Sequence, residues 1–360
     1  MSFSESPLKE QIFKNLKMVR TFHPVGQGAF YTERFYEGDK NVFNMVYDCG
    51  SSTKGQYLKN EINDAFKDGT GKAEIDILFV SHFHNDHVNG IEELARQYHI
   101  KQLAIPAPKL LSKDIVLNDY MHNLCVTSDI YNIANQLVEL CFTGDGEFEF
   151  FRDIQIIPLE DSAIQFPIIQ WEYLPFCGIH IAADKFMEAF LQEFNTFHEI
   201  YDNFTGSDFV AIRDYFENNE NVDKLKKFYN NYFKQQYRND NYYSMTLLSK
   251  QMGRDFDEAM CLYTGDYPAR EKDCLINLKK RYRAFWKRIK TIQAPHHGSG
   301  YDNPQDLHDE KGRNCVISYG QCNRYKHPNR NALLAIHFSK STLFTVNEDR
   351  ATDCTHCFTY

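Results

Sequence analysis

Three histidines and an aspartate lie within six residues, where an apolar segment gives way to a helical pattern: His82, His84, Asp86 and His87. The apolar residues 75–80 before them are typical of a buried strand, and helical spacing starts near Gly90. Imidazoles crowded into one surface turn would be unsatisfied or mutually repulsive without an ion. Imidazole and carboxylate ligands together suit Zn, Mn or Fe. The segment therefore predicts a metal centre at a strand end.

The spacing within this segment divides it between two metals. His82 and His84 alternate as residues of an extended strand do, so both can point the same way. Asp86 and His87 follow the turn and can face a second ion.

Composition narrows the class of protein. The 360 residues carry 49 acidic and 40 basic side chains, which gives a net charge of −9. A nucleic-acid-binding surface that is basic over the whole protein is therefore not expected, although local basic patches remain possible. The hydrophobic fraction of 42% excludes global disorder. The apolar runs are strand-sized, so no membrane contact is expected, and the N-terminus does not resemble a secretory signal. The ten cysteines have irregular spacing and are expected as reduced thiols, so we predict a cytoplasmic location.

The order of expected elements indicates one layered α/β domain. After a polar lead-in at residues 1–18, strands and helices alternate over residues 19–360. Residues 184–238 interrupt this rhythm, because phenylalanines recur there on one helical face: Phe186, Phe190, Phe194 and Phe197. We expect a helical insertion at 184–238, whose role as lid, nucleic-acid grip or dimer contact stays open.

The metal segment resembles the signature of the metallo-β-lactamase superfamily. Residues 46–50, with Asp48, resemble its early strand, residues 262–266 resemble the strand that ends in an aspartate, and residues 294–299 resemble its final histidine motif. The resemblance runs from about residue 19 to residue 346, apart from the helical insertion. It implies an αββα sandwich with a helical insertion.

The same resemblance implies two divalent metal ions, zinc with manganese as the alternative, joined by Asp266. Residues 238–246 hold no histidine, so the first metal would take only His82, His84 and Asp266 from the protein and keep a position open. The second metal would take Asp86, His87, Asp266 and His297, which directly precedes a glycine. His296 would face the substrate, and an exchange of roles between the two histidines is the alternative.

Further residues receive roles from this resemblance. Asp48 is expected to orient a ligating histidine rather than to bind metal. Asp86 and His296 are the predicted catalytic residues. Candidate substrate contacts are Ser299, Asn323, His327 and Asn241, with turn-holding for Ser299 and Asn323 and a structural role for His327 as the alternatives.

The final motif narrows the resemblance further. With residues 317–320 and 323–328 it looks like the soluble domain of bacterial DNA-uptake channel proteins, and it is similar to teichoic-acid phosphorylcholine esterases. These relatives imply a phosphodiesterase, most specifically a nuclease acting on DNA or RNA. In such an enzyme a hydroxide bound to two metals attacks phosphorus. The metals supply this hydroxide because they lower the pKa of bound water from ~15.7 towards ~7. Hydrolysis of a small phosphodiester, such as a cyclic nucleotide or phosphorylcholine, is a second hypothesis. A metal-bearing binding module without catalysis is a third.

A basic stretch at residues 279–290 supplies the candidate nucleic-acid contacts. Seven of these twelve residues are basic and aromatic residues lie among them, so the stretch could follow a phosphate backbone while its rings stack on bases. The alternative is a solvated helix face whose aromatic residues pack inward. The candidate contacts are Lys279, Lys280, Arg281, Arg283, Lys287 and Arg288.

Overall fold

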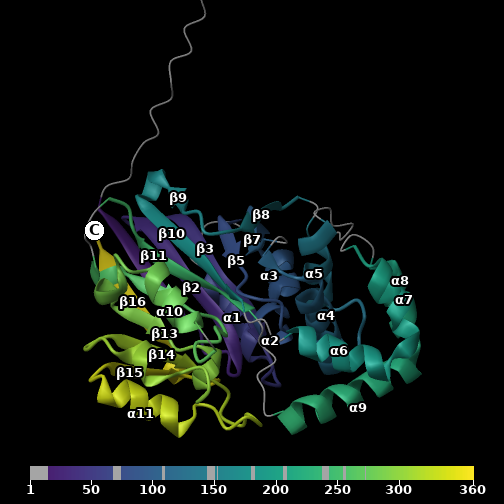
Figure 1. The fold of residues 1–360 in the computed structure, drawn as a ribbon. Coiled ribbons are helices and arrows are strands. Elements are labelled where there is room, and N and C mark those ends of the chain that lie inside the picture. The colour runs from purple at the N-terminus through teal and green to yellow at the C-terminus, as the bar shows by residue number, and fades with distance from the viewer. Residues whose placement is uncertain are drawn as a thin grey trace, which may run out of the picture.

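Two seven-stranded sheets packed face to face form the centre of the molecule (Figure 1). The computed structural model describes residues 15–67, 74–107, 110–143, 151, 153–179, 183–205, 209–236, 243–253, 257–271 and 273–360. Apolar side chains from both sheets, among them Phe35, Tyr47, Trp171 and Tyr263, form the buried layer between them. This layer requires strands with one face turned to the opposite sheet.

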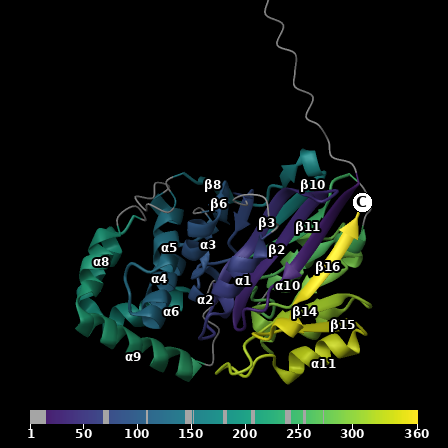
Figure 2. The same ribbon diagram turned by 180° about the vertical axis from the view of Figure 1, so that it is seen from behind.

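The first sheet combines antiparallel and parallel pairing. Its order is β16 (Cys354–Thr359), β1 (Leu16–Phe22), β2 (Gly28–Glu37), β3 (Lys40–Ser51), β5 (Ile77–Phe79), β7 (Gln102–Pro106) and β8 (Gln155–Leu159). Pairing is antiparallel from β16 to β3 and parallel from β3 to β8. β1 begins inside the stretch expected as a lead-in, and β16 lies beside it although the two come from opposite ends of the chain (Figure 2).

The second sheet has the same mixture. Its order is β15 (Thr342–Val346), β14 (Asn314–Ser318), β13 (Thr291–Gln293), β12 (Cys261–Tyr263), β11 (Tyr243–Gln251), β10 (Trp171–Ile179) and β9 (Ile164–Phe166). The four strands β12 to β15 run parallel, and β9 to β12 pair antiparallel. A small parallel pair, β4 (Glu74–Ile75) with β6 (His99–Ile100), lies apart from both sheets in the strand pairing.

Helices cover the outer faces of both sheets. On the first sheet are α1 (Tyr57–Ala65), α2 (Asn85–Val88), α3 (Ile91–Gln97), α4 (Lys113–Thr127) and α5 (Ile133–Thr143); on the second are α10 (Cys274–Arg281) and α11 (Arg330–Phe338). Short 3-10 turns complete the elements: η3 (Pro167–Ile169), η4 (Asn195–Phe197), η5 (Asp257–Ala259), η6 (Trp286–Arg288), η7 (His296–Gly298), η8 (Gln305–His308) and η9 (Arg350–Thr352). The predicted αββα sandwich is confirmed.

The segment expected to be helical holds α6 (Ala183–Glu193), α7 (His198–Asn203), α8 (Val210–Glu217) and α9 (Asn219–Gln236). These helices form an arc beyond α4 and α5 (Figure 1), and α6 and α9 pack against α4. All four phenylalanines of the expected apolar face are at most 1% exposed, and Phe186 contacts the rings of Phe228 and Tyr229 on α9. The phenylalanine face thus packs the helices of the arc against one another.

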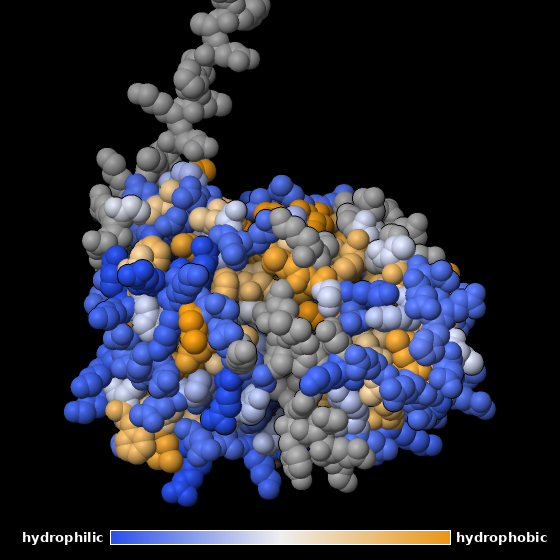
Figure 3. Space-filling view, viewed as in Figure 1, coloured by the Kyte–Doolittle hydropathy of each residue, from blue (hydrophilic) through white to orange (hydrophobic). Residues whose placement is uncertain are grey.

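Polar side chains cover most of the face seen in Figure 3, as expected where 25% of the residues are charged. Across the part of the chain that the structure describes, no helix is both long and apolar enough to cross a membrane.

Candidate metal centre

The predicted ligands come together where parallel strands of both sheets end. His82 and His84 follow β5, Asp266 follows β12 and His297 follows β13, while Asp86 and His87 lie in the first turn of α2. Carboxyl ends of parallel strands meet at one edge of a sheet, and the two sheets bring their edges together here. Chain segments far apart in the sequence therefore meet at one site.

Tight backbone approaches hold these loops in place. Gly265 has a φ of +52° and a Cβ there would lie 2.5 Å from the hydroxyl of Ser244, so no other residue fits before Asp266. His296, His297 and Gly298 have φ values of 50°, 52° and 77°, a left-handed run that non-glycine residues adopt only under constraint. This turn directs the two histidine rings to different partners.

Two groups of ligand atoms share His87. Nε2 of His87 lies 3.1 Å from Oδ1 of Asp266, and Nε2 of His82 lies 3.9 Å from Oδ2 of Asp266. Nε2 of His297 lies 3.4 Å from Oδ2 of Asp86. Among the described residues, His82, His87 and Asp266 form one group that could hold an ion, and Asp86, His87 and His297 form another.

Unsatisfied ring nitrogens show that these residues fit a metal. Nε2 of His82, His87 and His297 is buried in each case and has no hydrogen-bond partner within the described structure. Leaving a buried polar atom without a partner costs about 1–3 kcal/mol, and divalent cations held by the two groups would satisfy these nitrogens. The donor set of imidazoles and carboxylates suits zinc.

The directions of the pKa shifts in the site are compatible with metal binding. Burial, and then the neighbouring His87 and His84, hold the pKa of His82 well below its usual value, which keeps its ring in the neutral form that binds metal. Burial opposes ionisation of Asp266, but the imidazoles of His296 and His87 hold the pKa of this carboxyl well below its usual range. Burial also opposes a charge on His87, yet Asp266 and Asp48 raise its pKa well above normal. A cation bound here would displace that proton.

Each ring of the site is held by a second partner. Nδ1 of His87 lies 2.8 Å from Oδ2 of Asp48, which matches the orienting role expected of Asp48. Nδ1 of His82 lies 2.9 Å from the hydroxyl of Ser81. Nδ1 of His297 lies 3.1 Å from the carbonyl oxygen of Ser318. The roles of Ser81 and Ser318 leave no signal in the sequence, because their partners depend on the loop conformation.

His84 belongs to neither ligand group. Its ring centroid lies 4.7 Å from that of His82, its Nε2 lies 3.8 Å from Oδ1 of Asp119, and its ring stacks on His122 at 4.0 Å. Asp119 and His122 are on α4, and nothing in their sequence context identifies them.

His296 occupies a different position from His297. Nδ1 of His296 lies 2.7 Å from Oδ2 of the fully buried Asp302, and its Nε2 lies 3.6 Å from Oδ2 of Asp266. The ring of His327 lies 5.5 Å from that of His296, and burial with the neighbouring imidazoles lowers the pKa of His327 to about 3. Asp302 could have been suspected from its place six residues after His296.

The remaining candidate substrate contacts hold turns in this structure. The hydroxyl of Ser299 accepts a hydrogen bond from the backbone N–H of Tyr301 at 3.2 Å. The amide of Asn323 donates to the carbonyl oxygens of Gly320 and His327 and accepts from the N–H of His327. Asn241 lies outside the described residues.

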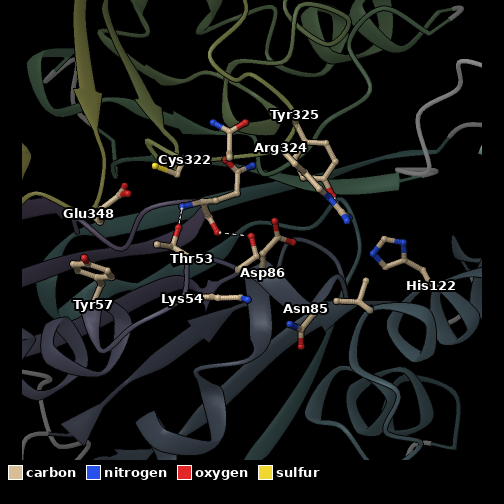
Figure 4. Close-up of a pocket in the computed structure, with 14 residues that line it drawn as sticks. Thr53, Lys54, Tyr57, Asn85, Asp86, His122, Cys322, Arg324, Tyr325 and Glu348 are labelled. Carbon is tan, nitrogen blue, oxygen red and sulfur yellow. Dashed lines mark hydrogen bonds between the residues drawn. The ribbon is translucent and has the colours of Figure 1, made fainter. Parts of the chain in front are cut away.

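A cavity of about 580 Å³ opens beside the site, large enough for a small organic ligand. Asp86 lies in its wall, with Lys54 and Asn85 on one side and Arg324 and Tyr325 on the other (Figure 4). Its wall also contains Gln27, Ser52, Thr53, Tyr57, His122, Val126, Cys322, Asn323 and Glu348. Two basic side chains therefore share the cavity wall with the candidate ligand Asp86, a position that suits a phosphate group.

The basic stretch at residues 279–290 contributes no residue to this cavity. Lys279 pairs with Asp309, Arg288 pairs with Asp257 at 2.6 Å, and Arg281 donates to the backbone oxygens of Asp161 and Pro175. Tyr282 and Trp286 are buried, which agrees with the alternative that the aromatic residues of this stretch pack inward. Lys280, Arg283 and Lys287 are exposed, and their contact with nucleic acid stays a prediction.

Comparisons with known proteins show which family one part of the chain resembles. Residues 36–158 match the sequence model of the metallo-beta-lactamase superfamily. Over these residues the chain is similar to this superfamily, whose fold implies binding of divalent metal. The nearer resemblance to DNA-uptake domains and phosphorylcholine esterases stays a prediction.

Individual relatives are distant. Ribonuclease Z of Methanococcus maripaludis strain C7 is 25% identical over 156 residues, which are 41% of this chain and 47% of the relative. The chain thus spans about half the length of the curated relatives it matches. The crystal structure of unliganded yeast PDE1 matches with a TM-score of 0.46 and 11% identity over 95% of this chain and 99% of that one. YhfI from Bacillus subtilis matches with a TM-score of 0.44 and 10% identity over 96% and 100%.

Proposed function

We propose that the protein is a metal-dependent phosphodiesterase that acts on nucleic acid. The observation that carries this proposal is the pair of ligand groups sharing His87, placed beside a cavity with Lys54 and Arg324 in its wall. Two ions would be held by His82, His87, Asp266, Asp86 and His297. Bound there, they would lower the pKa of water towards ~7 and offset charge on a phosphate.

The other residues of the site would bind and orient the substrate. Lys54 and Arg324 would pair with the non-bridging phosphate oxygens. His296, held by Asp302 at 2.7 Å, would in its doubly protonated form donate a hydrogen bond from Nε2 to the phosphate or to the leaving oxygen. The partial similarity to ribonuclease Z supports a nucleic-acid substrate.

A small phosphodiester is the second candidate substrate, and the shape of the site favours it. The cavity is walled by α4 through His122 and Val126, and the basic stretch that would follow a polymer does not reach its wall. A cyclic nucleotide fits about 580 Å³, as would a phosphorylcholine ester.

The test starts from protein purified without added metal. Elemental analysis gives the metal content, and a panel of bis-p-nitrophenyl phosphate, single- and double-stranded DNA, RNA, cyclic dinucleotides and a phosphorylcholine ester gives the substrate. We expect hydrolysis of the chromogenic diester, and loss of both metal and turnover in Asp266→Ala. Full activity in Asp266→Ala would sink the assignment, and a metal-loaded protein that cleaves no member of the panel would indicate a binding module.

A further inference from the structure

The histidines of the site differ in which ring nitrogen, Nδ1 or Nε2, faces a neighbouring protein group. His82, His87, His296 and His297 are all held at Nδ1, by Ser81, Asp48, Asp302 and the Ser318 carbonyl. Each of them therefore turns Nε2 towards the centre of the site. His84 is the exception, because the carboxylate next to it, Asp119, lies 3.8 Å from its Nε2.

Asp119 is itself fixed. It lies on α4, is 2% exposed, and its Oδ2 accepts a 2.7 Å hydrogen bond from the hydroxyl of Tyr243 at the start of β11. Tyr243 is also buried, so both oxygens of Asp119 have a defined direction. A carboxylate near one nitrogen of a ligating histidine sets which nitrogen binds the metal.

A second contact fixes the plane of the same ring. His122, one turn after Asp119 on α4, stacks on His84 with centroids 4.0 Å apart and planes within 14° of parallel. Nδ1 of His122 lies 2.9 Å from the hydroxyl of Tyr229 on α9. Tyr229 is 7% exposed and packs against Phe186 and Phe233 within the helical arc.

We infer that Asp119 and His122 are positioning residues of the metal centre, and that α9 completes this support through Tyr229. Asp119, 3.8 Å from Nε2 of His84, and His122, stacked on the same ring, would orient His84 beside His82 as a further ligand of the first metal. The helical arc thereby has a role in organising the metal centre, although none of its described residues lines the cavity. The inference rests on the metal centre of the proposed function and does not depend on which phosphodiester is cleaved.

Two variants test this on metal binding rather than turnover. Asp119→Asn keeps the size of the side chain and removes its charge, and Tyr229→Phe removes only the hydroxyl that meets His122. Each has a matched control: Asp114→Asn, because Asp114 also lies on α4 and accepts a 2.7 Å hydrogen bond from a tyrosine hydroxyl, and Tyr215→Phe, because Tyr215 on α8 bonds Thr196 within the arc. Zinc affinity is measured by competition with a chromogenic chelator, and the cobalt-substituted proteins are compared by visible absorption.

We expect a 10- to 100-fold loss of affinity for one of the two zinc ions in Asp119→Asn and a smaller loss, roughly 3- to 10-fold, in Tyr229→Phe, both with altered cobalt spectra. The control variants should match the wild type, and all metal-free proteins should show the same circular dichroism. Wild-type affinity in both test variants overturns the inference, and wild-type affinity in Tyr229→Phe alone removes α9 from it. A wild-type protein that binds no metal would instead overturn the proposed function.

Discussion

Asp48 orients the ring of His87, because Oδ2 of Asp48 lies 2.8 Å from Nδ1 of His87 and both side chains are buried. The same carboxylate accepts hydrogen bonds from the backbone N–H and the hydroxyl of Ser81, and this hydroxyl lies 2.9 Å from Nδ1 of His82. One carboxylate therefore orients two rings of the metal centre. Burial raises the pKa of Asp48, while the adjacent His87 opposes that rise.

Asp48→Asn should weaken metal binding by about 10- to 100-fold, because loss of the charge behind His87 lowers its basicity as a ligand. Metal affinity by chelator competition measures this, and excess zinc should restore part of the turnover. Asp76→Asn is the control, because Asp76 accepts comparable bonds from Asn44 and Lys101 outside the site. Equal affinity in wild type and Asp48→Asn would contradict the orienting role.

The two histidines of the final motif should respond differently to truncation. His297→Ala should lose metal together with activity, because Nε2 of His297 lies 3.4 Å from Asp86 in a ligand group. His296→Ala should keep its metal and lose turnover by about 10²- to 10⁴-fold, as for a donor to the reacting group. Elemental analysis beside kcat separates the two. The reverse pattern, with metal lost from His296→Ala alone, means that the roles are exchanged.

Local patterns in the sequence predicted an α/β domain with a metal segment at a strand end, and the resemblance of its ordered motifs to a known superfamily predicted the sandwich. An apolar strand followed by His82, His84, Asp86 and His87 defines its own turn, and the later strand that ends at Asp266 repeats the arrangement. β16 was not predicted, since its pairing with β1 joins opposite ends of the chain and leaves no local signal.

Asp119 and His122 could not have been predicted for a different reason. α4 is covered by α5 on one side and by α6 and α9 on others, so nine of its residues are buried and its sequence has no single apolar face. The periodicity of such a helix does not identify the partner of a buried aspartate, because side chains on every face of the helix contact other parts of the protein. Only the three-dimensional packing of α4 shows that Asp119 faces His84.

The cations of the cavity should matter more for a small diester than those of the basic stretch. Lys54→Ala and Arg324→Ala should each raise KM for bis-p-nitrophenyl phosphate by roughly 5- to 10-fold, the effect of about 1 kcal/mol for a partly exposed charge contact. Lys280→Ala and Arg283→Ala are the matched controls, since both residues are exposed and lie outside the cavity wall. An unchanged KM in Lys54→Ala and Arg324→Ala would place the phosphate elsewhere.

Polymer binding should depend on the exposed cations of the basic stretch. Charge reversal at Lys280 and Arg283 should weaken binding of single-stranded DNA and reduce the slope of log affinity against log salt, while the small diester is cleaved as before. Reversal at Arg281 is a poorer test because its guanidinium bonds two backbone oxygens. An unchanged salt slope would show that the stretch is only a solvated surface.

Acid should destabilise the metal-free protein through His308, which is 2% exposed. Burial, and then the charge of Arg313, lower the pKa of His308 to about 4, whereas an unfolded chain has a histidine pKa of ~6.5. Between these values the unfolded chain binds the extra proton, so the contribution to stability is complete above pH ~6.5 and is lost as the pH falls towards about 4. From pH 7 to pH 5 this histidine should reduce the free energy of unfolding by roughly 2 kcal/mol. Urea unfolding in the presence of a chelator should give a correspondingly smaller change with pH in His308→Gln than in wild type. Parallel pH profiles for the two proteins would show that His308 can be protonated without unfolding.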